Sequence, residues 1–362
     1  MIAKRKGRTL MILGTTLLVI AVVAATALLA YRDGNLHSDE RLIAKAHEAG
    51  FTEKQLQVDG ATINYAEGPN NGPALLLIHG QSTEWEDYAK VLPELAKSYH
   101  VFAVDCFGHG ESTHNASLYH CGAIGDAIIN FAHLAIGEPY AISGHSSGGI
   151  LAAYIAANDA DNVSACVLED PPFFNVLPEE VQEGKGAFVW FDGYVPAHEY
   201  ITEKPGEPYA VFYAERSYLF TLFGELKDEV IRETRAWCEN HPNDHIVSPW
   251  IPHDWTRGMY FMDDFDPEFG NTFFSGSWLE GVNQASLLKA IHCPTIYLKA
   301  ETSYGKDGVL YAANTDEDAA RVTELIPNCE MRTIKSGHNI HYEKPDFFTG
   351  AIHDAQEAGN AK

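Results

Sequence analysis

The sequence has few basic residues for its length. Lys and Arg total 25 in 362 residues, against 50 Asp and Glu, which gives a formal net charge of −25 at pH 7. Nucleic-acid binding requires clustered Lys and Arg, so we expect no nucleic-acid partner. A net charge of this size instead favours solubility of the part of the chain that meets water.

Closely spaced cysteines are also absent. The six cysteines are scattered and no CxxC pair occurs, so we predict no thiolate zinc site and no dense disulfide framework. Cys166 and Cys293 lie in or beside apolar runs and are predicted to be buried thiols. Cys106 and Cys121 are the one pair that we expect to form a disulfide. We predict no metal site and no cofactor.

Long runs made almost entirely of apolar residues are absent except for residues 10–30, which also carry no charge. At 1.5 Å per residue this segment can cross a hydrocarbon core of about 30 Å. Residues 1–9 before it carry four basic side chains and no acidic one, which keeps that end in the cytoplasm. We therefore predict a single-pass membrane anchor with residues 31–362 outside the cytoplasm. The alternative is a signal peptide cleaved near ATA at residues 25–27, which would release a secreted protein.

Beyond this segment the chain alternates short apolar runs with helical segments. The apolar runs predict strands at residues 74–80, 100–105, 139–144, 164–170, 294–300 and 331–337. Alternation at this spacing is typical of an α/β fold, in which a mostly parallel sheet is flanked by helices.

One long interruption separates the fourth of these runs from the fifth. Residues 173–290 hold 23 of the chain's 41 aromatic side chains and no strand signal. A structureless loop of that length would be uncommon in a compact domain, so we predict an inserted cap. The chain then consists of the anchor, a polar stalk at 31–54, a core at 55–172 and 291–362, and the cap.

A candidate nucleophile lies in AISGHSSGG, residues 141–149. This stretch joins an apolar run to an alanine-rich helical segment, and it contains G-x-S-x-G, in which small residues let the chain turn sharply and hold the central serine in a strained, exposed conformation. Ser146 has glycine at both minus two and plus two. Ser143 and Ser147 lack that spacing, so Ser146 is the predicted nucleophile.

A serine needs a base and donors for the oxyanion. The segment IKSGHNIHYEKP after the last predicted strand offers His338 and His341, and Gly337 gives His338 the freedom to reach the site. We assign His338 as the base and His341 to a loop or supporting role. The N–H groups of Gln81, in LLLIHGQS, and of Ser147 are the predicted oxyanion donors.

Four motifs in this order resemble the α/β-hydrolase superfamily over roughly residues 55–355. The motifs are HGQ (79–81), DCFGHGES (105–112), GHSSGG (144–149) and SGHNIHYEKP (336–345). The resemblance implies an eight-stranded, mostly parallel sheet with a cap after the sixth strand, and the chain order nucleophile, acid, histidine. Members with an aspartate nucleophile, the epoxide hydrolases and haloalkane dehalogenases, are disfavoured by the serine.

The acid departs from the usual pattern of that superfamily. An aspartate commonly follows the seventh strand, and here Asp307 before GVL resembles its turn, so we rank Asp307 first. Some members place the acid after the sixth strand, where this chain offers Glu169 and Asp170. Glu301, at the end of the strand predicted over residues 294–300, is a further alternative.

These residues together predict a membrane-anchored serine hydrolase that works outside the cytoplasm through an acyl-enzyme. Aromatic side chains of the cap are expected to line a pocket for a small apolar or aromatic ester, thioester or lactone. The same catalytic residues would also serve a carbon–carbon or amide hydrolase, and a catalytically silent binding module is the alternative of another class. His241, His245 and His253 are irregularly spaced loop histidines and are not predicted to bind metal. The oligomeric state is left open.

Overall fold

The computed structural model describes residues 2–175, 186–242 and 244–361 of the chain. Its centre is one eight-stranded sheet in the order β1-β2-β4-β3-β5-β6-β7-β8. The strands are β1 (Thr52–Val58), β2 (Ala61–Glu67), β3 (Ala74–Ile78), β4 (His100–Val104), β5 (Tyr140–His145), β6 (Val163–Glu169), β7 (Thr295–Ala300) and β8 (Cys329–Ile334). β2 is antiparallel to β1 and β4, and all other pairs are parallel. This confirms the predicted fold class.

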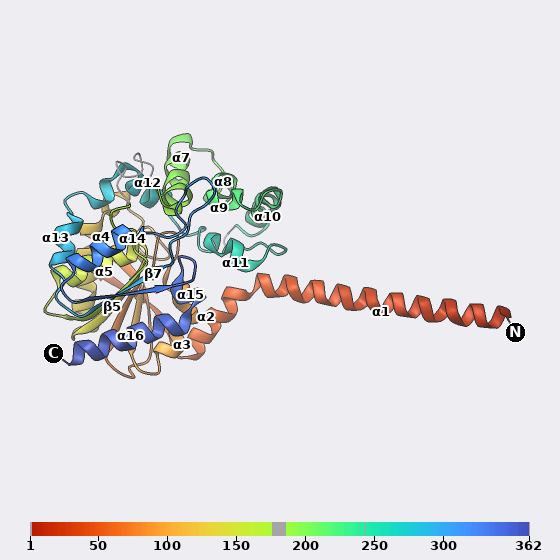
Figure 1. The fold of residues 1–362 in the computed structure, drawn as a ribbon, viewed down its shortest axis with the longest axis horizontal. Helices are drawn as coiled ribbons and strands as arrows, with labels where there is room; N and C mark the ends of the chain where they lie inside the picture. Colours follow the sequence, from red (N-terminus) through yellow and green to blue (C-terminus); the bar gives the residue numbers. More distant parts are fainter. Residues whose placement is uncertain (1, 176–185, 243, 362) are drawn as a thin grey trace.

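Helices cover both faces of the sheet (Figure 1). In β3, Leu76 and Ile78 join one buried cluster while Leu75 and Leu77 join another, because successive side chains of a strand point to opposite faces. The core helices are α3 (Leu92–Leu95), α4 (Cys121–Phe131), α5 (Ser147–Asn158), α14 (Asp316–Leu325), α15 (Ile340–Glu343) and α16 (Pro345–Asn360). α4 and α5 contribute to the first cluster, and α16 contributes to the second. The central strands are therefore buried on both sides.

Between β6 and β7 the described residues form helices and turns. These helices are α7 (Val195–Glu203), α8 (Tyr209–Arg216), α9 (Tyr218–Thr221), α10 (Leu226–Asn240), α11 (His253–Thr256), α12 (Pro267–Ser275) and α13 (Gln284–Lys289). Most of them lie at one edge of the sheet, above the carboxyl ends of the parallel strands (Figure 1). They occupy the interval assigned to the cap, of which residues 176–185 and 243 lie outside the described residues, as do residues 1 and 362.

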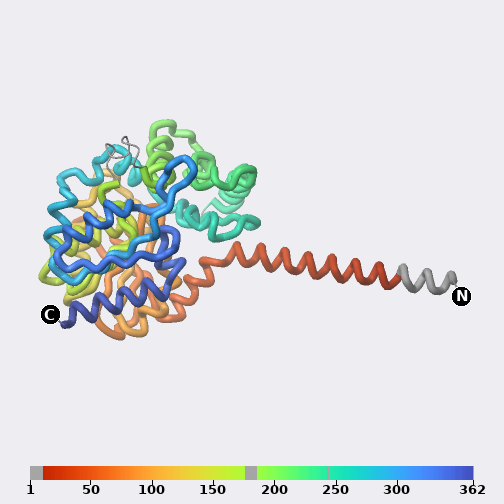
Figure 2. The backbone as a smooth tube through the Cα atoms, viewed as in Figure 1, coloured from red at the N-terminus to blue at the C-terminus, as the bar shows by residue number. Residues whose placement is uncertain are grey.

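The N-terminal segment forms α1 (Ile2–Leu36), followed by α2 (Ser38–Glu48). Residues 11–36 are long and apolar enough to cross a membrane, and none of their most apolar stretch is buried in the protein. α1 projects from the body as a single straight helix (Figure 2). α2 does not stand free as the expected stalk, because Ala46 is buried in the second core cluster and Asp39 is 2 % exposed.

The expected disulfide is absent. Cys106 and Cys121 are free thiols and both are buried, in the first core cluster. Burial raises the pKa of both thiols, which keeps them protonated. Cys166 is buried and free as predicted, whereas Cys293 is only partly buried.

Candidate active site

Ser146 lies on a sharp turn between β5 and α5. Its backbone has φ 55° and ψ −122°, a conformation that is strained for any residue except glycine. The turn requires the flanking glycines: a Cβ at Gly144 would lie 2.0 Å from the Gly148 carbonyl oxygen, and one at Gly148 would lie 2.2 Å from the His79 carbonyl oxygen. Main-chain atoms therefore approach each other so closely at this turn that only glycine fits at both positions. The tight turn holds Ser146 at the start of α5.

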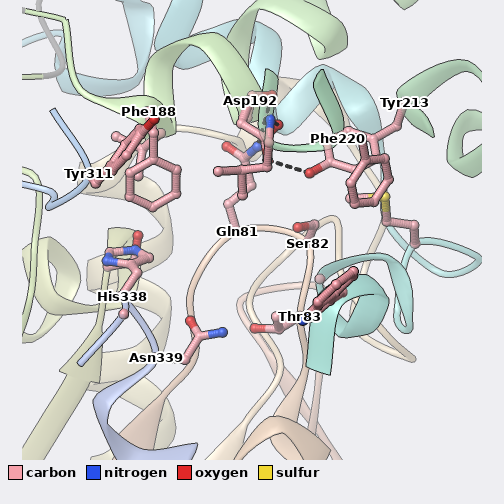
Figure 3. A pocket seen from close by; sticks show the side chains of 18 of the residues that line it. Gln81, Ser82, Thr83, Phe188, Asp192, Tyr213, Phe220, Tyr311, His338 and Asn339 are labelled. Carbon is pink, nitrogen blue, oxygen red and sulfur yellow. Dashed lines mark hydrogen bonds between the residues drawn. The ribbon is translucent and has the colours of Figure 1, made fainter. Parts of the chain in front are cut away.

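His338 and Ser146 line the same cavity. The Nδ1 atom of His338 lies 2.7 Å from Oδ2 of Asp170, which is fully buried. A carboxylate at this nitrogen fixes the tautomer, so that Nδ1 carries the proton and Nε2 is left as the base. In Figure 3 the His338 ring projects into the cavity beneath Phe188 and Tyr311.

Asp170 is held in place from several sides. It follows β6 directly with φ 41°, and its Oδ1 accepts a hydrogen bond from the Ala300 N–H and its Oδ2 one from the Ala313 N–H. The first donor ends β7 and the second lies in the loop after it. The acid position therefore depends on the packing of two neighbouring strands.

The acid that contacts His338 is not the first-ranked Asp307. Asp307 is exposed, and its carboxylate accepts a hydrogen bond from the Tyr218 hydroxyl at 2.8 Å instead. Glu301 is also exposed, at the end of β7. Both follow the seventh strand, whereas the histidine loop reaches the end of the sixth. The ranking is thus corrected in favour of Asp170.

Glu169, the neighbouring alternative, belongs to a separate buried ion cluster. Its carboxylate lies 2.8 Å from Nδ1 of His341, whose Nε2 lies 3.2 Å from Oδ2 of Asp87. Arg257 donates to Asp87 at 2.6 Å and to Asp39 at 2.9 Å, so the cluster joins core, cap and α2. We name Glu169, His341, Asp87, Arg257 and Asp39 the buried ion cluster.

The charges of this cluster are mutually stabilised. Burial alone would lower the pKa of His341, but the carboxylates of Glu169 and Asp87 outweigh it and raise the pKa to about 10. Burial likewise opposes the charge on Asp87, yet His341 and Arg257 hold the pKa of that carboxyl well below its usual range. His341 is therefore an imidazolium three residues after His338. Asp87, Arg257 and Asp39 were not predicted as site residues, because nothing in their local sequence marks them.

Two further histidines shape the turns around Ser146. His145 donates its Nε2–H to the His338 carbonyl at 3.1 Å, and burial lowers the His145 pKa to about 4, so the ring is neutral. His79 accepts a hydrogen bond from the Cys106 N–H at 2.9 Å, and burial lowers its pKa to about 4 as well. The His145 ring therefore connects the turn at Ser146 to the loop of His338, and the His79 ring connects the turn after β3 to the turn after β4.

The predicted oxyanion donors lie at the same end of the sheet. Ser147 is the first residue of α5, so its N–H has no acceptor within that helix. Gln81 lines the cavity, and its side-chain amide donates to the Gly193 carbonyl of the cap at 3.2 Å. The turn that carries Gln81 lies close to Ser146, since a Cβ at Gly80 would lie 3.1 Å from the Ser146 Cβ.

The cavity has a volume of about 390 Å³ and lies between core and cap. Aromatic and aliphatic side chains of the cap dominate its wall, among them Phe188, Tyr194, Tyr209, Tyr213, Leu219, Phe220 and Met262. Asp192 also lines it, but its carboxylate is occupied by the Tyr213 and Ser217 hydroxyls and the Leu219 N–H. Figure 3 shows Phe220 and Tyr213 opposite Phe188 and Tyr311, with Gln81 between them. The wall suits an apolar group.

Metal-ligating side chains approach one another in three places within the described residues. These are Asp87 with His145 and His341, Glu84 with Glu86 and His245, and His245 with Asp263 and Asp264. The imidazolium of His341 and the guanidinium of Arg257 already balance Asp87. The three loop histidines do not converge, since His241, His245 and His253 contact Asp244, Asp263 and Asp39 respectively. We assign no metal to these groups.

Comparison with known proteins extends these observations. A family model described as alpha/beta hydrolase fold matches residues 73–345. A Haemophilus influenzae protein named as an esterase/lipase is 24% identical over 288 residues, which cover 78% of this chain and 82% of that protein. Fluoroacetate dehalogenase of a Burkholderia species is 32% identical over 171 residues, 44% of this chain and 51% of the enzyme.

Solved structures share the fold over most of the chain. A membrane phospholipase A, described as a bacterial virulence factor, aligns with a TM-score of 0.58 at 21% identity and covers 94% of this chain and 97% of its own. A protein of Acinetobacter baumannii named as a lipase aligns with a TM-score of 0.61 at 19% identity and covers 89% and 97%. At these identities the likeness establishes the fold.

Proposed function

The chain belongs to the α/β-hydrolase fold family, and on that premise we propose that it is a membrane-anchored serine hydrolase that acts outside the cytoplasm. Its substrate is an apolar or aromatic carboxylic ester, thioester or lactone. The observation that carries the proposal is the contact of His338 with buried Asp170 beside a strained serine in one apolar cavity.

In the proposed reaction the Ser146 hydroxyl attacks the carbonyl carbon while Nε2 of His338 takes its proton. The new oxyanion accepts hydrogen bonds from the main-chain N–H groups of Gln81 and Ser147. The leaving group departs with the proton from His338, which leaves an acyl group on Ser146. Water, deprotonated by the same nitrogen, then releases the acid. Asp170 stabilises the imidazolium in both steps.

The two main parts of the proposal have different support. The nucleophile rests on the geometry of the turn, since a glycine-flanked serine with positive φ at a helix start is the arrangement that exposes a hydroxyl to a bound carbonyl. The membrane location rests on α1, whose apolar residues 11–36 are long enough to span and whose preceding residues are basic.

Labelling with a fluorophosphonate tests the nucleophile. The full chain in detergent is expected to react with one equivalent, and Ser146→Ala is expected to lose both labelling and hydrolysis of a panel of ester, thioester and lactone substrates. Ser147→Ala keeps its main-chain N–H and is the matched control, expected to label normally. Labelling that persists in Ser146→Ala would assign the nucleophile to another residue. Amide and carbon–carbon substrates in the same panel separate the alternative reactions.

A further inference from the structure

The cap carries exposed apolar side chains at the place where α1 meets the body. Leu222 is 53% exposed, Leu226 46%, Trp250 47% and Trp255 48%. We call these four residues the cap patch. They share a small region, since the Phe223 ring lies 5.0 Å from the Trp255 ring and Glu233 of α10 accepts the Trp250 N–H.

The base of α1 is bonded to the same part of the cap. The Tyr31 hydroxyl donates to the Trp250 carbonyl at 3.3 Å, and the Asn35 amide donates to the Pro249 carbonyl at 3.0 Å. Asn35 also accepts the His253 N–H. These bonds fix the direction in which α1 leaves, and Figure 1 shows α11 beside its emerging end, with α10 beyond α11.

This anchoring sets the height of the cap patch above a membrane. The uncharged run ends at Ala30, and at a rise of about 1.5 Å per residue Tyr31 and Asn35 lie roughly 1.5 and 7.5 Å beyond it. The headgroup layer on each side of a bilayer is about 5–7 Å deep, as the difference between its total thickness and its hydrocarbon core. Pro249 and Trp250, which accept these hydrogen bonds, therefore lie at the level of the lipid headgroups. Trp side chains are enriched at this level of a membrane.

The mouth of the cavity opens at the same place. Leu222 and Trp255 line both the cap patch and the cavity, and exposed Asp254 and Gly258 line the cavity beside them. The same cavity thus reaches from two residues of the cap patch to the aromatic wall around Ser146. An apolar substrate dissolved in the membrane would reach the serine without crossing water.

We propose that the cap patch docks on the surface of the lipid bilayer and that the cavity takes its substrate directly from the membrane. This inference rests on the proposed membrane anchoring and hydrolase activity, and it narrows the substrate to an amphiphile with an apolar chain. Exposed acidic residues Glu225, Asp228 and Asp254 flank the patch, so the docking surface fits zwitterionic rather than anionic lipid.

Tryptophan quenching tests the docking. The full chain is placed in nanodiscs of phosphatidylcholine carrying a nitroxide near the headgroup. Part of the tryptophan emission is expected to be quenched, and Trp250→Phe and Trp255→Phe are each expected to reduce that quenched part. If the quenched part of the emission is the same in both variants as in the wild type, the docking is wrong. The docking is also wrong if the cap patch is buried against a second copy of the chain, which would be detected as dimers in larger nanodiscs.

A bilayer-held ester and a water-soluble ester distinguish an effect on membrane docking from an effect on the catalytic reaction. Leu226→Ser with Trp250→Ser removes patch residues that do not line the cavity, and Leu134→Ser removes an apolar side chain that is 66% exposed elsewhere. The double variant is expected to lose at least about fivefold in hydrolysis of a long-chain ester held in the bilayer, because exposed apolar area no longer inserts, while a short water-soluble ester is hydrolysed as by the wild type. The Leu134 variant is expected to retain both activities.

The outcomes distinguish the two proposals. If the wild type hydrolyses neither ester but its tryptophans are quenched, the reaction is wrong and the docking stands. If both esters are hydrolysed equally by the wild type and the double variant, the reaction stands and the uptake from the membrane is wrong.

Discussion

Oδ2 of Asp170 lies 2.7 Å from Nδ1 of His338, although 168 positions separate the two residues in the chain. Asp170 is the first residue after β6, and His338 lies in the loop that follows β8. The two meet because parallel strands bring their carboxyl ends to one edge of the sheet. The contact selects one carboxylate among the candidates and leads to the first of five predictions.

Asp170→Asn is expected to reduce kcat for ester hydrolysis by about 10⁴-fold, because an amide NH₂ facing Nδ1 of His338 would donate a hydrogen bond where the carboxylate accepts one, and would favour the wrong tautomer of that ring. Asp307→Asn is the matched control and is expected to change kcat by less than about twofold, since that carboxylate contacts only the Tyr218 hydroxyl and a local main-chain N–H. Steady-state kinetics of both folded variants provide the measurement. Equal losses in the two variants would contradict the assignment.

Because of the buried ion cluster, we expect the free energy of unfolding to decrease as the pH rises into the alkaline range. The pKa of His341 is raised to about 10 in the folded protein, while an unfolded histidine titrates near 6.5. The stabilisation by its charge is therefore fully present below about pH 6.5 and is lost progressively as pH rises through about 10. Urea unfolding of the full chain in detergent between pH 6 and 10 measures this loss.

His341→Gln is expected to lower the free energy of unfolding by about 3–5 kcal/mol at pH 7, because Glu169 and Asp87 would remain buried without their shared cation. The variant should also show a flatter dependence of stability on pH than the wild type. His353→Gln, a partly buried histidine on α16 that contacts the Tyr99 hydroxyl, is the control. A pH dependence identical to the wild type would refute the role assigned to His341.

Gly148→Ala is expected to abolish activity and to destabilise the fold. Its Cβ would lie 2.2 Å from the His79 carbonyl oxygen and 2.4 Å from that of Ile78, both main-chain atoms that cannot turn aside. The turn carrying Ser146 would have to move, and a displacement of about 1 Å near a reacting group can cost about 100-fold in rate. Gly350→Ala, where a Cβ would meet nothing within 4 Å, should behave as the wild type. Fluorophosphonate labelling rates compare the two variants.

Phe220→Leu is expected to shift the preference of the enzyme towards longer acyl chains. Phe220 is 3% exposed and lines the cavity, so a smaller side chain adds room at the apolar wall. One methylene in an apolar pocket changes kcat/KM by about tenfold or more. Phe173→Leu makes the same change at a fully buried phenylalanine outside the cavity and should leave the ratio unaltered. The ratio of kcat/KM for dodecanoyl and hexanoyl esters is the readout, and an unchanged ratio in the Phe220 variant would exclude this wall as the acyl site.

Much of the architecture was predictable because it depends on local patterns. The six predicted apolar runs correspond to β3 to β8. The inner strands among them are apolar because they are buried on both faces, whereas β8 is a partly exposed edge strand. β1 and β2 were not among the predicted strands: β1 is largely exposed and polar, and β2, although mostly buried, has the sequence ATINYAE, which is not a continuous apolar run. The disulfide expected between Cys106 and Cys121 failed for a related reason: both side chains pack into the core as thiols, and sequence spacing does not report on that packing.

The sequence by itself determined the features that depend on neighbouring residues. Glycine at minus two and plus two marks Ser146, a glycine just before it marks His338, and one long apolar run marks α1. The tertiary structure alone decided which carboxylate meets His338, and it alone assembled the buried ion cluster from α2, the core and the cap. The physical reason is that the role of a carboxylate depends on the group that it contacts in the folded protein, and this contact is not visible in the sequence. In an acidic chain every candidate looks alike until the ends of β6 and β7 bring one of them to the histidine and leave Asp307 in water.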